Sequence, residues 1–285
     1  MLSLYNHKKE NVLKYIMVFL FFSYALPDEE ETYMFKIKYL PKETVKYKSD
    51  FLMGFDAGGR ETTQGQQDVT IRKFIGEKDG HLLIEETITD IIAIQKTLDK
   101  VSADHDMNRL ADIPYILYID STGYIDDIST EFLEFEDEIR VLKMGMDVEN
   151  LLYPFGIGAK NVSIGDTWIS DPDSVTMFAG DGGIENYMLL ESEYTLKKVK
   201  LKKGRKIATI KTKTMMNCNL SMVQGGKLFE GDVNGIIKGK VLFDLDMGKM
   251  ILIQSSGSLN WDFSMEDKSF SGAMDMTHKQ RMINK

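Results

Sequence analysis

The residues that could do chemistry are scattered along this sequence and form no recognisable constellation. The four histidines are His7, His81, His105 and His278. Only the run 104–106 (Asp-His-Asp) places several metal-ligand side chains together. Adjacent residues in a polar loop rarely converge on one metal ion, and no second ligand pair follows at the spacing of a zinc site. We therefore expect no metal.

The sequence shows no motif for nucleophilic catalysis or phosphate binding. Cys218, the one cysteine, lies in a strand-like run with no base beside it. We interpret it as a small packed apolar side chain, and it has no partner for an intramolecular disulfide. No Gly-x-Ser-x-Gly elbow occurs, and the glycine-rich run 179–183 does not join a strand to a helix. These observations predict no catalytic residues, no cofactor and no enzyme activity; a hydrolase is the hypothesis with least support.

The feature with a functional interpretation is a set of methionine, aromatic and aliphatic side chains. Flexible, polarisable methionines line surfaces that accept varied apolar shapes, and the chain has 18 of them. We predict that the set lines an apolar groove. The alternative is that it forms ordinary core between a sheet and a helix, and both hold if the helix covers only part of the sheet. The predicted lining residues are Trp261, Phe263, Met265, Met274, Met276, Met216, Leu220, Phe132, Phe135 and Ile139.

The elements that must position these residues are mostly strands. Apolar and polar residues alternate along 33–39 and 45–48, the period of a half-buried strand. Turn residues between alternating runs predict four hairpins, because Asp-Gly and Lys-Gly pairs tolerate the positive φ angles of tight turns. The predicted turns are 78–80, 120–123, 203–204 and 246–248.

One segment has the period of a helix instead. Between Ser129 and Leu152, apolar residues recur at steps of three and four from Phe132 to Met146, which places them on one helix face. Ser129 or Thr130 would cap the helix. The sequence predicts one amphipathic helix over 130–152, with its glutamates facing solvent.

The turn glycines repeat with a similar spacing in both halves. Gly80 and Gly123 are 43 residues apart, and Gly204 and Gly248 are 44 apart. This indicates an internal duplication of a hairpin unit, with halves 33–152 and 160–280. The alternative is an ordinary meander, which gives similar spacings.

The N-terminal 25 residues resemble a secretory signal peptide. Lys8, Lys9 and Lys14 precede the apolar run 15–26, and Ser23 and Ala25 suit a cleavage site. The run is shorter than the roughly 20 residues of a membrane-spanning helix. We predict a signal at 1–25, followed by a single β-rich domain at 26–285 in the periplasm, at the cell surface or in the medium. An uncleaved anchor is the alternative.

The charge excludes one class of partner. The formal net charge is −9, whereas nucleic-acid binding requires clustered cations. We expect no nucleic-acid partner, and the negative balance also argues against an anionic membrane surface as the main partner.

Several short motifs occur along the chain after the signal. They lie at 35–47, 77–81, 119–125, 153–168 (with Val162, Gly165, Asp166 and Trp168 in a V-x-x-G-D-x-W pattern) and 239–248. Together they resemble an exported bacterial family of unknown function, whose fold is similar to the half-barrel of periplasmic lipoprotein carriers, over nearly the whole chain after the signal. The resemblance implies a hydrophobic groove for a lipid or acyl chain and carries over no catalytic residues.

The predicted class is mainly β (α+β): a curved antiparallel sheet, or half-barrel, cupping one principal amphipathic helix. We predict an exported, non-enzymatic binding protein that holds an apolar small molecule, lipid or acyl chain between sheet and helix. The alternative is a structural or protein-interaction module of the cell envelope, with a filled core and no ligand, whose edge strands pair with an envelope protein.

Overall fold

The structure is a computed structural model of the whole chain. It describes residues 31–57, 60–97, 100–103, 111–129, 161–169, 173–179, 184–224, 227–265 and 268–283. The chain divides into two compact units, Met1–Thr32 and Tyr33–Lys285, and the description below concerns the second. The predicted signal at 1–25 lies outside the described residues and stays a prediction.

Every regular element in these ranges is a β-strand. The short strands are β1 (Thr32–Met34), β5 (Lys100–Ala103), β6 (Pro114–Ile119), β7 (Ile125–Ser129), β8 (Asn161–Ser163), β9 (Thr167–Ile169) and β10 (Asp173–Ala179). The long strands are β2 (Thr44–Ala57), β3 (Arg60–Lys78), β4 (His81–Thr97), β11 (Ile184–Lys202), β12 (Arg205–Gln224), β13 (Lys227–Asp244), β14 (Lys249–Met265) and β15 (Lys268–Ile283).

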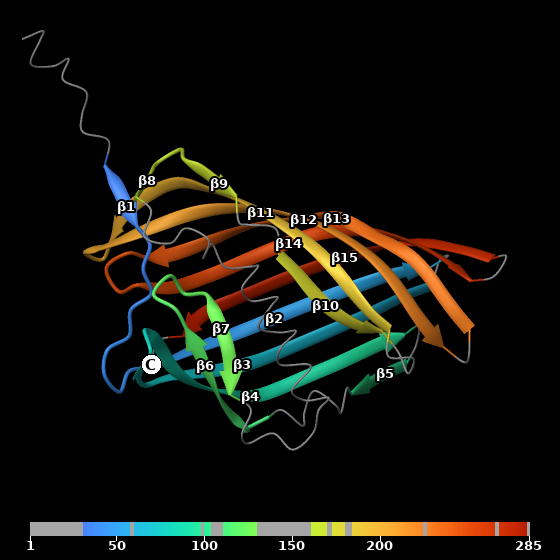
Figure 1. Cartoon of the computed structure of the whole chain (residues 1–285), viewed down its shortest axis with the longest axis horizontal. Helices are drawn as coiled ribbons and strands as arrows, with labels where there is room; N and C mark the ends of the chain where they lie inside the picture. The colour runs from blue at the N-terminus through green and yellow to red at the C-terminus, as the bar shows by residue number, and fades with distance from the viewer. Residues whose placement is uncertain are drawn as a thin grey trace, which may run out of the picture. The chain divides into compact units, whose positions relative to one another are not determined.

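Thirteen of these strands form one antiparallel sheet. Its order is β10-β11-β12-β13-β14-β15-β2-β3-β4-β6-β7, with β5 on β4 and β9 on β11, while β1 and β8 pair separately. Two sequential meanders are therefore joined side by side, because the last strand, β15, pairs with β2, the first strand of the sheet. Figure 1 shows the sheet passing from β11–β13 through β14 and β15 to β2–β4.

The four predicted hairpins are confirmed. They are β3–β4, β6–β7, β11–β12 and β13–β14. The first turn shows why the sequence specified them: Asp79 and Gly80 have φ of 51° and 85°, and such paired positive φ angles match the twist of a hairpin.

The sheet has a buried, apolar face and a solvent-exposed face, which we call the inner and outer faces. Directly paired residues share a face, so the pairs Ile210–Val241 and Val241–Ile253 mark the inner one. All three side chains are buried. The intervening Lys211 and Lys240 point to the opposite, outer face and are exposed.

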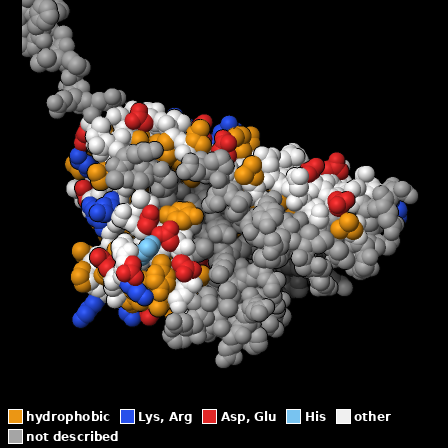
Figure 2. Space-filling view, in the orientation of Figure 1, with side chains coloured by type: hydrophobic (Ala, Val, Ile, Leu, Met, Phe, Trp, Pro, Cys, Tyr) orange, Lys and Arg blue, Asp and Glu red, His pale blue; other side chains and the backbone are white. Residues whose placement is uncertain are grey.

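One end of the inner face is closed by extended chain, residues 33–43, which we call the strap. Phe35 packs against Phe243 and Trp168, with ring centroids 5.5 and 6.3 Å apart. Tyr39 stacks on Phe74 at 6.2 Å. The strap thus touches two buried clusters, one centred on β11–β14 and the other on β4, β6 and β7. Among the described residues on the face seen in Figure 2, charged side chains of both signs are mixed.

Part of the predicted strand over 33–39 is wrong. Strand pairing stops at Met34. The residues that follow make two other kinds of contact. The Lys38 amide donates to the Gly248 carbonyl oxygen at 3.2 Å, and Phe35, Ile37 and Tyr39 pack into the two clusters.

The predicted α+β class, a sheet cupping an amphipathic helix, is also wrong. The described ranges contain strands and no helix, so the fold is all β. The physical reason is visible at the closed end. There the strap, the β1–β8 pair, β9 and the β6–β7 hairpin bury the inner face with extended chain. The segment 130–152, where the helix was expected, lies outside the described residues. No helix in the described ranges is long and apolar enough to cross a membrane.

Candidate ligand-binding face

The inner face carries a methionine-rich cluster along its other end, away from the strap. Its buried members are Met188, Leu190, Cys218, Val233, Ile237 and Leu259. Six larger, half-buried side chains pack against them: Met216, Leu220, Trp261, Phe263, Met274 and Met276. We call these twelve residues the methionine cluster. They come from β11, β12, β13, β14 and β15, so five neighbouring strands build one continuous apolar surface.

Strand register explains why these side chains meet. One row of directly paired residues runs Leu190, Met216, Gly235, Leu259 and Met274 across the five strands. Cys218, Val233 and Trp261 form part of the next row. Since residues two apart in a strand share a face, the two rows lie side by side on the inner surface.

Glycines within the strands make room for the largest rings. A Cβ atom on Gly272 would lie 2.3 Å from Cζ2 of Trp261, and one on Gly231 would lie 2.5 Å from Cδ1 of Phe263. Both aromatic rings therefore lie against bare backbone of the neighbouring strand, the arrangement in which an aromatic side chain covers a strand glycine. The rings also contact each other, with centroids 5.6 Å apart.

A polar belt separates the methionine cluster from the closed end. Ser49, Asp68 and Thr70 are buried on the inner face of β2 and β3. Gln66 Nε2 and Thr70 Oγ1 each donate to the Asp68 carboxylate at 3.2 Å. Burial raises the pKa of Asp68 above its ordinary 3.8, although hydrogen bonds from Gln66, Thr70 and Ser49 oppose the rise. On the inner face of β2 and β3, the belt thus supplies buried hydrogen-bonding groups beside the methionine cluster.

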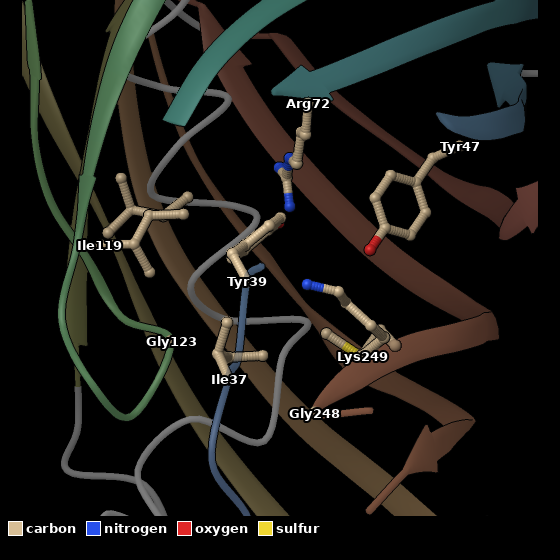
Figure 3. Close-up of a pocket in the computed structure, with 10 residues that line it drawn as sticks. Ile37, Tyr39, Tyr47, Arg72, Ile119, Gly123, Gly248 and Lys249 are labelled. Atoms are coloured by element: carbon tan, nitrogen blue, oxygen red, sulfur yellow. The ribbon is translucent and has the colours of Figure 1, made fainter. Parts of the chain in front are cut away.

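The closed end has a cavity too small for a lipid. It measures about 20 Å³ and is lined by Ile37, Tyr39, Tyr47, Arg72 and Lys249, among others. A single water needs at least about 10–15 Å³, so the cavity has room for about one. Lys249 and Arg72 both point toward Tyr39 in Figure 3.

The cations beside this cavity are held by buried ion pairs. Lys249 Nζ lies 3.1 Å from Glu43 Oε2 and 3.3 Å from the centre of the Tyr39 ring. Burial lowers the pKa of Lys249 below 10.5, and Glu43 partly offsets this. Arg72 pairs with Glu86, which also accepts from the Tyr115 hydroxyl. The Lys249–Glu43 pair fastens the strap to β14, and the Arg72–Glu86–Tyr115 group links β3, β4 and β6.

Six of the ten predicted groove residues are brought together in the methionine cluster: Met216, Leu220, Trp261, Phe263, Met274 and Met276. Met265 is the last residue of β14. Phe132, Phe135 and Ile139 lie outside the described residues. Whether the cluster holds a ligand stays a prediction.

Sequence reasoning left out part of this surface. Phe51, Met53 and Phe55 of β2 pair with His278, Met276 and Met274 and therefore extend the inner face beyond β15. The alternation of these apolar residues in the sequence was the signal that could have placed them on one face. Their partner strand could not be identified from the sequence, because β15 lies more than 200 residues away.

The described residues contain no group of three or more His, Cys, Asp or Glu side chains that could hold a metal ion. The run 104–106 lies outside them. Cys218 is free and buried, and burial raises the pKa of its thiol, the opposite of what a reactive cysteine requires.

No protein-family model and no curated protein sequence matches the chain. Among solved structures, it is similar in fold to one that describes lipid–protein interactions in lipovitellin, with a TM-score of 0.52 and 10% sequence identity. The match covers 87% of this chain and 26% of the lipovitellin chain. The chain therefore spans about a quarter of that protein, and the likeness concerns the fold. The resemblance to an exported bacterial family stays a prediction.

Proposed function

We propose that this protein is an exported, non-enzymatic binding protein that holds an apolar ligand, a lipid or acyl chain, against the inner face of its sheet. The observation that carries the proposal is the methionine cluster, in which large half-buried apolar side chains from β12, β14 and β15 share one surface. Export rests on the resemblance of residues 1–25 to a signal peptide.

The side chains of the cluster suit a flexible hydrocarbon. Met216, Met274 and Met276 have unbranched, polarisable side chains that change rotamer to follow an irregular apolar partner. Burying a tail against them stabilises the complex by roughly 25 cal/mol per Å² of apolar surface removed from water. The polar belt at Ser49, Asp68 and Thr70 could then face the polar end of an amphiphilic ligand.

The fold comparison supports the same proposal. The lipovitellin structure concerns lipid–protein interactions in that protein, and its likeness to this chain covers 87% of the chain. A fold of this kind therefore occurs in a protein whose structure concerns lipid–protein interactions, and we extend that association to this protein by analogy of fold.

The two tryptophans allow a direct test. Trp261 belongs to the methionine cluster, whereas Trp168 lies at the closed end, stacked on Tyr194 at 5.8 Å. Trp168→Phe and Trp261→Phe variants would each leave one emitting tryptophan, since the chain has two. We would add a monoacylglycerol with a brominated acyl chain, which quenches indole fluorescence on contact, and the unbrominated lipid as the blank.

We expect the brominated lipid to quench Trp261 in the Trp168→Phe variant and to leave Trp168 bright in the Trp261→Phe variant. A matched pair of charge substitutions locates the face: Met276→Asp on the inner surface should weaken binding at least about tenfold because it buries a carboxylate. Thr277→Asp, the next residue on the outer surface, should not. Equal quenching of both tryptophans would place the lipid elsewhere.

Absence of quenching in both variants would favour the alternative, a structural or interaction module of the cell envelope with a filled core. The water-sized cavity of the closed end supports this alternative, because it shows that this part of the inner face is already packed. Native mass spectrometry of the exported protein, purified without detergent, would give the independent readout. A stoichiometric apolar adduct supports the binding protein, and a clean mass after incubation with lipid supports the module.

A further inference from the structure

On the outer face of the sheet, strand pairing brings like charges together in two places. Strand pairing places Lys211 opposite Lys240 and Lys213 opposite Lys238, and it places Arg281 opposite Lys48. With Lys279 these residues form what we call the basic patch. All are exposed except Lys48, which is half-buried.

Two acidic pairs on the same face lie further along the strands. Asp232 is paired directly with Asp262, and Asp56 with Glu61. All four are exposed. Like charges directly opposite each other destabilise an antiparallel pair, so fold stability does not account for this arrangement. Because several like-charge pairs break this pairing rule on one face of the sheet, that face is a candidate functional surface.

The seven cations of the basic patch lie within a limited area of the outer face. Neighbouring strands are about 4.8 Å apart, so β12 to β2 spans roughly 19 Å. Rows two residues apart on one face add about 7 Å each. Acidic side chains stand at its borders, Glu193 opposite Lys213 and Asp50 opposite Lys279. On β14, which crosses the patch, Gln254 and Ser256 are uncharged.

The net charge of the protein does not cancel the patch at short range. Lys238 and Asp232 are six residues apart on β13, about 20 Å, whereas charges are screened over about 8 Å at physiological ionic strength. An anionic surface that contacts the patch therefore meets seven cations with Glu193 and Asp50 beside them, a local excess of positive charge, although the whole chain carries −9. The negative net charge alone argued against an anionic membrane surface as the main partner, and that argument does not extend to this patch.

We propose that the basic patch on the outer face of β12, β13, β15 and β2 docks the protein onto an anionic lipid bilayer. Six of its seven cations are lysines, compact hydrated charges that suit the diffuse negative potential of a headgroup layer. A nucleic-acid site would call for arginine forks and aromatic side chains on which bases stack. The proposal concerns the outer face and stands whether or not the inner face holds a ligand.

The test is sedimentation of the full exported chain with vesicles of phosphatidylcholine alone and vesicles that also contain phosphatidylglycerol. We expect binding to the anionic vesicles, little binding to the neutral ones, and release at high salt. A variant with Lys211, Lys213, Lys238 and Lys240 changed to Gln should bind at least about fiftyfold more weakly. One basic residue near an anionic surface is worth about 1 kcal/mol, or about fivefold.

A charge-matched control separates position from net charge. Lys36, Lys42, Lys78 and Lys202 are exposed outside the patch, and changing these four to Gln alters the net charge equally. We expect that variant to keep most of its binding. Equal losses in both variants, or equal binding to neutral and anionic vesicles, would overturn the proposal. Binding to a polyanion such as heparin or DNA, with none to anionic vesicles, would overturn the bilayer as partner.

Discussion

The buried ion pair beneath the strap predicts an asymmetry between two substitutions, Glu43→Gln and Lys249→Met. The Lys249 side chain is 2% exposed and the Glu43 side chain 20%, and the two charged atoms are 3.1 Å apart. At an effective dielectric constant of about 20, charges at that distance attract by about 5 kcal/mol. Removing the Glu43 charge leaves a buried ammonium group with only neutral partners among the described residues, the Tyr39 ring and the Lys38 carbonyl oxygen, whereas removing Lys249 leaves a carboxylate that water reaches.

The expected magnitudes follow from this difference in exposure. Glu43→Gln should destabilise the protein by about 2–3 kcal/mol, less than the Coulomb figure because Glu43 is partly solvated and glutamine keeps a hydrogen-bond acceptor. Lys249→Met should change stability by less than about 1 kcal/mol, since a methionine of similar length can pack against the Tyr39 ring. The double variant should resemble Lys249→Met alone, because the two residues act as one unit.

The assay is thermal unfolding followed by far-ultraviolet circular dichroism, with urea unfolding as the second readout. For a chain of this size about 1 kcal/mol shifts Tm by about 2–4 °C, so we expect Glu43→Gln to lower Tm by roughly 5–10 °C. The urea m value should not change, which would show that the unfolded reference is the same. A Lys249→Met variant that loses as much stability as Glu43→Gln would refute the reasoning, because the cost would then come from lost packing.

Two further predictions use the inner face. Because burial raises the pKa of Asp68 above 3.8, the folded state binds more protons than the unfolded state between 3.8 and the raised value, so stability should fall as pH rises through that window. Asp68→Asn should remove this contribution, and parallel pH profiles of urea unfolding for variant and wild type would contradict it. Cys218 is buried with a raised thiol pKa, so a thiol reagent should label it far more slowly in the native protein than in urea; equal rates would show that the methionine cluster opens freely.

The hairpins could be predicted because their determinants are local. Asp79 with Gly80, and Lys203 with Gly204, are adjacent residues whose positive φ angles define the turn wherever the strands lie. The grouping of Trp261, Phe263, Met274 and Met276 was also predictable in part, since alternation assigns the residues of one strand to one face.

The pairing of β15 with β2 and the course of the strap could not be read in the same way. Alternation states which residues share a face but not which strand lies alongside, so Met276 gives no sign of its partner Met53. Phe35, Ile37 and Tyr39 alternate like a strand, yet they cross the end of the sheet and pack on Phe243 and Phe74. The like-charge pairing on the outer face was hidden for the same reason, because it arises only when Lys211 is placed beside Lys240.

The two ends of the inner face differ in a way that decides where a ligand could enter. At the closed end, Leu196, Ile210 and Val241 have no exposed surface and are covered by a strap that a buried ion pair holds in place. Displacing that cover would break the Lys249–Glu43 pair and expose the two buried apolar clusters to water, so the free-energy cost opposes opening there. At the other end Met216, Met274 and Met276 stay half-buried, and thioether side chains change rotamer at little cost. An apolar ligand should therefore displace side chains at the methionine cluster and leave the strap in place. This is why quenching confined to Trp261, with Trp168 unaffected, is the outcome that separates a ligand-binding face from a uniformly filled core.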